Sequence, residues 1–239
     1  NASVRASATF NKEKWNWSND LSLAFGGIKY LDESEVIMYQ KTDDKIDLSS
    51  MLGIRISKKY LISLNTGFKT QFADGFNYPN DSIAISKFMA PGYMNLALGT
   101  DYVKDAKFSV FGSPFAAKTT FVMDDSLSQI GSFGVEKGER IRHEFGAFVK
   151  LKWNAELMKN IEMKSKLELF SNYLNNPQNI DVNAELVFVF RVNSLFSATA
   201  QWNLIYDDDI QIRDIDGNVG PRTQFKSVLG IGISYKLEN

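Results

Sequence analysis

Apolar and polar side chains alternate strictly along 180–206, in two runs separated by a short turn at 192–194. Successive side chains of a strand point to opposite faces, so each run predicts a strand with one apolar and one polar face. The thirteen residues of 180–192 would span about 40 Å, or roughly 28 Å at a tilt near 45°, close to the ~25 Å apolar band of an outer-membrane barrel. The pattern therefore predicts a hairpin that crosses a bilayer. The apolar positions of its first strand are Ile180, Val182, Ala184, Leu186, Phe188, Phe190 and Val192.

The same alternation recurs along the rest of the chain and predicts eleven strands in all. Pro114 interrupts the sixth strand, where it would remove a donor from the hydrogen-bond ladder, so we expect a bulge or kink there. Besides the two strands of the hairpin at 180–206, nine more are predicted, at 1–11, 15–25, 46–56, 60–72, 94–102, 108–123, 140–153, 161–173 and 225–237. The third strand is expected to begin at Ile46 and the seventh to include Arg140.

Short and long connections alternate between these strands, as in outer-membrane barrels with short periplasmic turns and long extracellular loops. Aromatic residues of the apolar face gather at the short-turn end, which predicts an interfacial girdle on the periplasmic side. This girdle includes Trp15, Trp17, Tyr60, Tyr102, Trp153 and Tyr235. Bacterial single-chain barrels have an even number of strands, so we expect a twelfth strand upstream of Asn1. The predicted fold is an all-β, up-and-down antiparallel transmembrane barrel of twelve strands, forming a single domain over 1–239.

Composition excludes several other classes. Lys and Arg total 27 against 28 for Asp and Glu, which does not favour nucleic acid, since its binding needs a concentrated basic surface. The chain has no cysteine, which excludes disulfides and thiolate metal sites. No apolar run is long enough for a spanning helix, and Asn1 begins at once in a strand pattern, so we expect any export signal to have been removed or omitted.

A large soluble β-sandwich would also show alternating strands with a charged outer face. It explains neither the strand length nor the alternation of short and long connections. The last strand, GISYKL at 232–237, resembles the C-terminal signal read by the outer-membrane assembly machinery. We therefore favour the barrel.

Several segments resemble a domain-of-unknown-function family of outer-membrane β-barrel proteins from Bacteroidota. The resemblance covers nearly the whole chain. It implies a porin-like barrel exported to the outer membrane of a Gram-negative envelope, and it implies no activity. The segments are KTDDKIDLSSMLGIRISKKY at 41–60, FKTQFADGFNYPND at 68–81, FMAPGYMNLALGTDY at 88–102, LFSNYLNNPQNIDVN at 169–183 and NLIYDDDIQI at 203–212.

Charged residues with inward parity mix both signs, which favours salt-bridge networks inside a narrow lumen over catalytic carboxylate pairs. We predict the lumen-lining charges to be Arg5, Asp47, Arg55, Lys69, Arg140, Arg142, Glu144, Lys150, Glu168, Asp181, Glu185 and Arg191. The single histidine, His143, falls on the apolar face near the outer rim, which favours an interfacial side chain over a catalytic one. We therefore predict no catalytic residue and no enzymatic activity.

The loop at 207–221 holds the densest cluster of oxygen ligands. Asp214, Asp216 and Asn218 have the two-residue spacing and the nearby glycine of some Ca²⁺ loops. The remaining ligand positions of an EF-hand are absent from the register, so a solvated acidic loop is favoured over a calcium site. We expect no other cofactor.

Two functions are compatible with this sequence. The first is a structural or accessory barrel with an occluded lumen, acting through its extracellular loops or within a larger envelope complex. The alternative is a narrow channel for small anionic solutes, since inward cations outnumber inward acids. In both, the expected partners are outer-membrane lipid and lipopolysaccharide, with the short turns and the C-terminus in the periplasm and the long loops outside.

Overall fold

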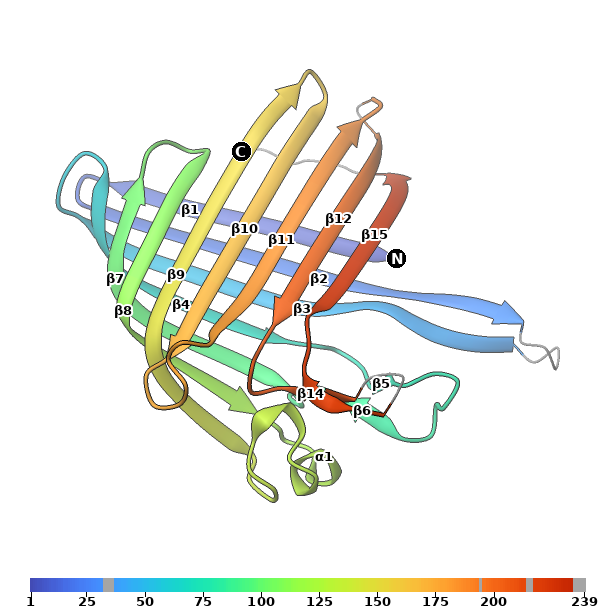
Figure 1. Cartoon of the computed structure of the whole chain (residues 1–239). Helices are drawn as coiled ribbons and strands as arrows, with labels where there is room; N and C mark the ends of the chain where they lie inside the picture. Colours follow the sequence, from blue (N-terminus) through green and yellow to red (C-terminus); the bar gives the residue numbers. More distant parts are fainter. Residues whose placement is uncertain (32–36, 194, 214–216, 234–239) are drawn as a thin grey trace. The chain divides into compact units, whose positions relative to one another are not determined.

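The computed structural model of the chain describes residues 1–31, 37–193, 195–213 and 217–233. Its main element is an eleven-stranded sheet in which the strand order follows the order of the chain (Figure 1). The predicted up-and-down arrangement of eleven strands is therefore confirmed. The strands are β1 (Ala2–Lys12), β2 (Trp15–Leu31), β3 (Ile37–Arg55), β4 (Tyr60–Thr70), β7 (Gly92–Val103), β8 (Phe108–Phe121), β9 (Ile141–Met158), β10 (Ile161–Asn172), β11 (Ile180–Arg191), β12 (Phe196–Tyr206) and β15 (Gln224–Ile233).

Smaller elements occupy the long connections. Two short hairpins pair β5 (Gly75–Phe76) with β6 (Ala84–Ser86), and β13 (Gln211–Arg213) with β14 (Val219–Pro221). The β8–β9 connection contains the helix α1 (Asp125–Gln129) and the 3₁₀ turn η1 (Ser132–Gly134). Among the described residues, no helix is long and apolar enough to cross a membrane.

The chain divides into two compact units that are interleaved in sequence. Unit 1 comprises 1–56, 62–98 and 116–145, and unit 2 comprises 57–61, 99–115 and 146–239. Strands β4, β7, β8 and β9 each contribute residues to both units.

In unit 1, β2 and β3 form a hairpin that extends beyond the end of the neighbouring strand β1 (Figure 1). The pairing of β1 with β2 ends at Ala2 and Phe25, whereas β3 continues to pair with β2 as far as Leu31. The predicted start of the third strand at Ile46 is wrong, because β3 begins at Ile37. The polar stretch around 40–45 lacks a clean alternation, but ladder hydrogen bonds use only the backbone and do not require one.

A small apolar cluster lies beside α1 in unit 1. Ala90, Val122, Leu127 and Val135 are buried together, and Phe133 packs against them. The sequence predicted only a loop here. Asp124 caps α1 by accepting a hydrogen bond from the backbone N–H of Leu127, which satisfies one of the donors left open at a helix start.

In unit 2, β11 and β12 form the hairpin that the opening pattern predicted. They run beside β10 and β15 in one antiparallel ladder (Figure 1). Asn193 shapes the turn between them, since its side-chain oxygen accepts hydrogen bonds from the backbone N–H groups of Leu195 and Phe196, each at 2.8 Å.

The irregularity predicted at Pro114 is also confirmed. The hydroxyl of Ser113 accepts a hydrogen bond from the backbone N–H of Phe115 and donates one to its carbonyl. Before this point the buried side chains of β8 are Phe111 and Ser113, and after it they are Ala116 and Thr120. The buried positions thus change from odd to even, as a bulge of one extra residue requires.

Candidate membrane surface and charged inner face

Burial in the sheet is opposite to that of a water-soluble protein. In β4, Ser63 and Asn65 are no more than 1% exposed, whereas Ile62 is 42% exposed. In β9, Glu144 and Lys150 are buried and Phe145 is exposed. We call the face that carries the buried polar side chains the inner face and the opposite one the outer face. The described residues form no larger second sheet that could cover the outer face, since the other two sheets have two strands each.

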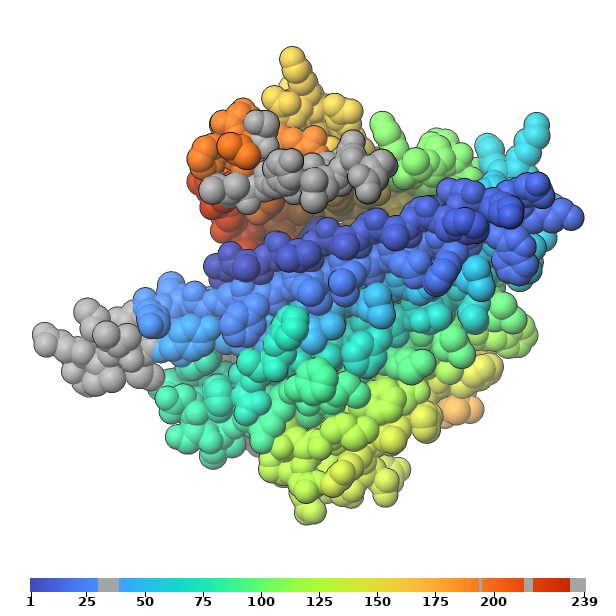
Figure 2. Space-filling view, turned by 180° about the vertical axis from the view of Figure 1, so that it is seen from behind, coloured from blue at the N-terminus to red at the C-terminus, as the bar shows by residue number. Residues whose placement is uncertain are grey.

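The outer face is apolar along several neighbouring strands of unit 1. In Figure 2, the side chains of β1 and β2 form a continuous open surface. The exposed apolar residues of β2, β3, β4 and β7 within this unit include Trp15, Trp17, Phe25, Leu48, Leu52, Ile54, Ile62, Leu64, Met94, Leu96 and Leu98. Apolar patches of this extent mark contact with a membrane or another protein.

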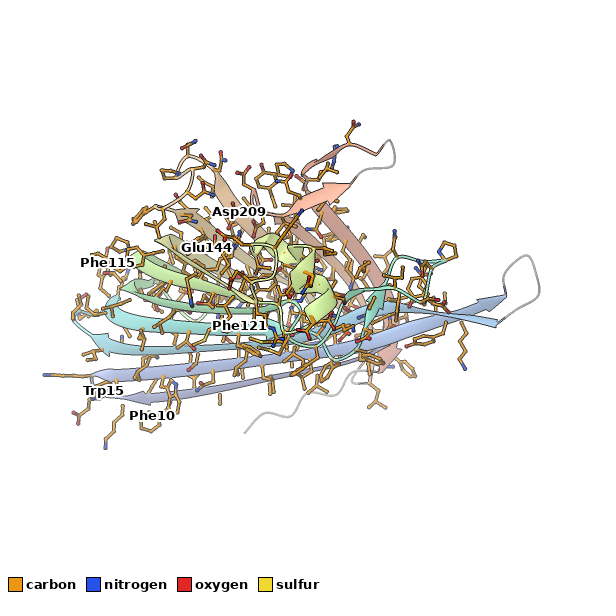
Figure 3. All side chains as sticks on the ribbon, turned by 90° about the horizontal axis from the view of Figure 1, so that it is seen from below. Phe10, Trp15, Phe115, Phe121, Glu144 and Asp209 are labelled. Atoms are coloured by element: carbon orange, nitrogen blue, oxygen red, sulfur yellow. The ribbon has the colours of Figure 1, made fainter. Side chains whose placement is uncertain are left out.

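Exposed aromatic side chains lie at the short-turn end of the strands, where the sequence predicted a girdle. Figure 3 shows Phe10 and Trp15 near the β1–β2 turn, and Glu144 among the side chains of the other face. Tyr60 is exposed and contacts Tyr102, with ring centroids 5.2 Å apart. Trp17 and Trp153 are also about half exposed. The sixth predicted girdle residue, Tyr235, lies outside the described residues.

In unit 1, the inner face concentrates charge around Glu144. Its carboxylate lies 3.0 Å from the guanidinium of Arg142 and 3.7 Å from the ammonium of Lys118. Asp47 pairs with Lys45 of its own strand at 3.4 Å. Lys118 was missed by the sequence analysis, because the bulge at Pro114 reverses the facing of everything after it in β8.

In unit 2, two of the predicted inner charges, Lys150 and Glu168, pair with each other. The two residues are direct partners in the β9–β10 ladder, and the Lys150 Nζ atom lies 3.7 Å from Glu168 Oε1. Glu168 also pairs with Lys166 at 3.0 Å and accepts a hydrogen bond from the Asn183 side chain at 3.0 Å. This carboxylate is therefore the centre of a four-residue network on the inner face.

The other predicted inner charges have varied environments. Arg191 is exposed and pairs with Glu162 at 2.8 Å. Arg5 and Arg55 are exposed, whereas Lys69, Asp181 and Glu185 are half-buried. The placement of Arg140 in a strand is wrong. It precedes β9, and its guanidinium pairs with Asp125 of α1, because the capped helix brings an acidic residue to the strand's start.

His143 is exposed on the outer face, as its parity predicted. Its Nδ1 atom lies 3.1 Å from the hydroxyl of Thr119 on the neighbouring strand. A serine nucleophile needs a base that a third group orients. The hydrogen bond to Thr119 instead gives the imidazole a polar partner on an otherwise apolar surface.

The acidic loop after β12 is tied to the β10–β11 connection. Asp208 accepts hydrogen bonds from the side chains of Asn179 and Tyr206, at 2.5 and 3.3 Å. Asp209 accepts one from Asn175 at 3.1 Å. Of the proposed calcium ligands, Asp214 and Asp216 lie outside the described residues, within which no group of three His, Cys, Asp or Glu residues is suited to a metal ion.

Two contacts that the sequence did not predict fix the β4–β7 connection. The carboxylate of Asp44 accepts hydrogen bonds from the backbone N–H groups of Phe72 and Ala73, at 2.7 and 3.0 Å, and pairs with Lys41 at 2.7 Å. Lys87 reaches Asp124, the cap of α1, at 2.7 Å. We call this second contact the loop latch.

The loop latch changes the protonation of both partners. The hydrogen bonds that Asp124 accepts from Lys87 and Ser126 lower its pKa far below the ordinary value of 3.8. The hydrogen bond to Asp124 raises the pKa of Lys87 above 10.5. Both groups are therefore charged over the whole neutral range.

One comparison with known proteins gives a match. Residues 1–76 match the family described as Protein of unknown function (DUF3078). The predicted resemblance to a domain-of-unknown-function family is thereby confirmed for this segment, which spans β1 to β5. No curated protein and no solved structure matches the chain.

Proposed function

We propose that this protein is an integral β-barrel of a bacterial outer membrane, and that it acts without enzymatic activity as a structural or accessory component of the envelope. One observation carries the proposal: apolar side chains are exposed along the outer face while polar and charged ones are buried along the inner face. Exposing apolar area to water costs about 25 cal/mol per Å². A lipid environment removes this cost.

The dimensions of the outer face support a bilayer. On β2, Trp15 and Phe25 are both exposed and lie ten residues apart on the same side of the strand. Ten residues span about 34 Å along a strand and about 24 Å of height at 45°, which agrees with the ~25 Å apolar band of outer-membrane barrels. Aromatic residues at both ends of this distance fit the two interfacial girdles of such a barrel.

The inner face supports an occluded lumen over an open pore. In unit 2, Phe111, Phe148 and Phe170 are no more than 7% exposed, and the rings of Phe111 and Phe148 lie 6.2 Å apart. The charges beside them are paired around Glu168. A water-filled pore would instead leave charged groups available to passing ions.

Planar-bilayer recordings test both parts of the proposal. The purified protein should insert into bilayers, as shown independently by flotation with liposomes, and give no steady conductance. Insertion with a steady, anion-selective current that turns toward cations in the Arg55→Glu/Lys69→Glu variant would replace the occluded barrel by an anion channel. Failure to float with liposomes would overturn the membrane location itself.

A further inference from the structure

The short-turn end of unit 2 has a step between two neighbouring hairpins. The backbone N–H of Asn154 donates to the carbonyl of Lys107 at 2.7 Å, so β9 is level with the β7–β8 turn at this point. β9 nevertheless continues to Met158, paired with β10 on its other side. The β9–β10 turn therefore extends past the β7–β8 turn (Figure 1).

A shallow depression of about 450 Å³ occupies this step. Trp153 and Phe108 supply its apolar part, and Trp153 is 49% exposed on the outer face. The depression is thus continuous with the surface that we assign to lipid. Its lining residues are Lys104, Asp105, Lys107, Phe108, Trp153, Asn154, Ala155 and Glu156.

The charges around the depression are balanced and open to a ligand. Lys104, Lys107 and Glu156 are exposed, and among the described residues neither lysine makes an ion pair. Asp105 differs, because one of its carboxylate oxygens already accepts hydrogen bonds from the backbone N–H groups of Lys107 and Phe108, at 2.8 and 2.9 Å. Two cations on the turn thus share the depression with the carboxylate of Glu156 on β9, for which the described residues likewise provide no ion pair.

We propose that this depression binds the head group of a zwitterionic phospholipid that carries a phosphate and a primary ammonium. Lys104 and Lys107 hold the phosphate as point charges with several donors, and Glu156 accepts from the ammonium. The glycerol and the first acyl carbons lie against Trp153, a side chain suited to the boundary between water and lipid. The proposal rests on the membrane location argued above.

The arrangement of charges favours this occupant over other lipids. A purely anionic head group would satisfy the lysines but would bring its charge toward Glu156. A choline head group carries no N–H to donate to that carboxylate. Phosphoethanolamine satisfies all three side chains, and only a lipid that carries it also uses the exposed face of Trp153.

Native mass spectrometry of the detergent-solubilised protein tests the site with three added lipids of matched chains: phosphatidylethanolamine, phosphatidylglycerol and phosphatidylcholine. We expect phosphatidylethanolamine to be retained about tenfold better than the other two, a difference of about 1.4 kcal/mol. The Lys104→Gln/Lys107→Gln variant should lose this retention. Glu156→Gln should remove the preference for phosphatidylethanolamine over phosphatidylglycerol.

The matched control is Lys12→Gln/Lys14→Gln, which removes two cations beside Trp15 at the short β1–β2 turn of unit 1. This variant should retain phosphatidylethanolamine as the native protein does. Brominated phosphatidylethanolamine in vesicles gives a second measurement, the quenching of tryptophan fluorescence. Trp153→Phe should reduce this quenching more in the native chain than in the Lys104→Gln/Lys107→Gln chain, because the lipid lies against Trp153 only where the two lysines hold its phosphate.

Equal retention of the three lipids, or equal losses in the site and control variants, would overturn the head-group site. Liposome flotation separates this result from failure of the proposed function. A protein that floats with liposomes but shows no lipid preference lacks only the site, whereas a protein that does not float also contradicts the membrane location.

Discussion

Lys150 of β9 and Glu168 of β10 are direct ladder partners on the inner face, and their charged groups lie 3.7 Å apart. The Lys150 side chain is 3% exposed and that of Glu168 is 11% exposed. Burying a charge costs several kcal/mol unless partners compensate it. The pair therefore joins two strands in a way that an open, hydrated pore would not require.

The network predicts unequal effects for its two members. Glu168→Gln removes the carboxylate that compensates both Lys150 and Lys166, so it should destabilise the fold by about 3–5 kcal/mol, the usual cost of breaking a buried pair. Lys150→Met should cost less, because Lys166 still neutralises Glu168. Urea unfolding of the two variants in liposomes measures the difference. Equal, small losses would indicate that water fills the inner face.

The facing of β11 predicts a position-dependent cost of a charge. Phe188→Arg should oppose insertion by about 2–4 kcal/mol, the range for arginine at mid-bilayer. Val187 has the opposite facing but is only 4% exposed, so arginine would be crowded there. Its ladder partner Gln201 is half-buried on the inner face and makes a fairer control. Folding yields into liposomes should fall for Phe188→Arg and stay near native for Gln201→Arg, and the reverse order would invert our facing assignment.

The loop latch predicts a pH dependence at both extremes. Asp124 has a lowered pKa, so its contribution is complete above 3.8 and is lost as the pH falls through the lowered value. Lys87 has a raised pKa, so its contribution is complete below 10.5 and is lost as the pH rises through the raised value. The Met123 amide donates a hydrogen bond to the Met89 carbonyl. Its protection from hydrogen exchange should therefore be high and independent of pH between these limits.

Lys87→Met should raise exchange at Met123 across the neutral range, because the latch is then absent at every pH. Asp81→Asn, an exposed change in the same connection, serves as the control and should leave the protection unaltered. Full protection in Lys87→Met would show that the apolar cluster around Leu127, rather than the latch, holds the two connections.

Gly146 predicts a steric limit on the β9–β10 pairing. A Cβ atom at this position would lie 1.8 Å from the carbonyl oxygen of Ser171, so the strands would have to separate. Gly146→Ala should cost about 1–3 kcal/mol, as overpacking does. At Gly112 a Cβ atom meets nothing within 4 Å, so Gly112→Ala is the matched control. Thermal unfolding should distinguish the two, and equal midpoints would argue against the close approach.

The repeated alternation of apolar and polar residues predicted the strands of the sheet. The period-two patterns at 180–192 and 196–206 predicted β11 and β12 closely, and the position of Pro114 predicted the bulge in β8. The inward facing of Lys150 and of Glu168 also followed from parity, whereas their pairing depends on the register of β9 against β10.

The sequence pattern did not predict the features that depend on tertiary contacts. The polar start of β3 is a strand because β2 provides a ladder partner, and α1 depends on the Asp124 cap and on burial of Leu127. Asp44 gave no local signal, since the backbone donors that it binds lie 28 and 29 residues away. The step beside Trp153 arises from unequal hairpin lengths, which alternation alone does not set.

Accessibility along β7 tests most directly the claim that the outer face contacts lipid. The chain has no cysteine, so single cysteines carrying a nitroxide can be placed one at a time. In liposomes, labels at Met94, Leu96 and Leu98 should be relaxed strongly by oxygen, which concentrates in lipid, and weakly by a water-soluble nickel complex. Labels at Tyr93 and Asn95 should be protected from oxygen. Uniform access of the nickel complex to all five positions would contradict the account.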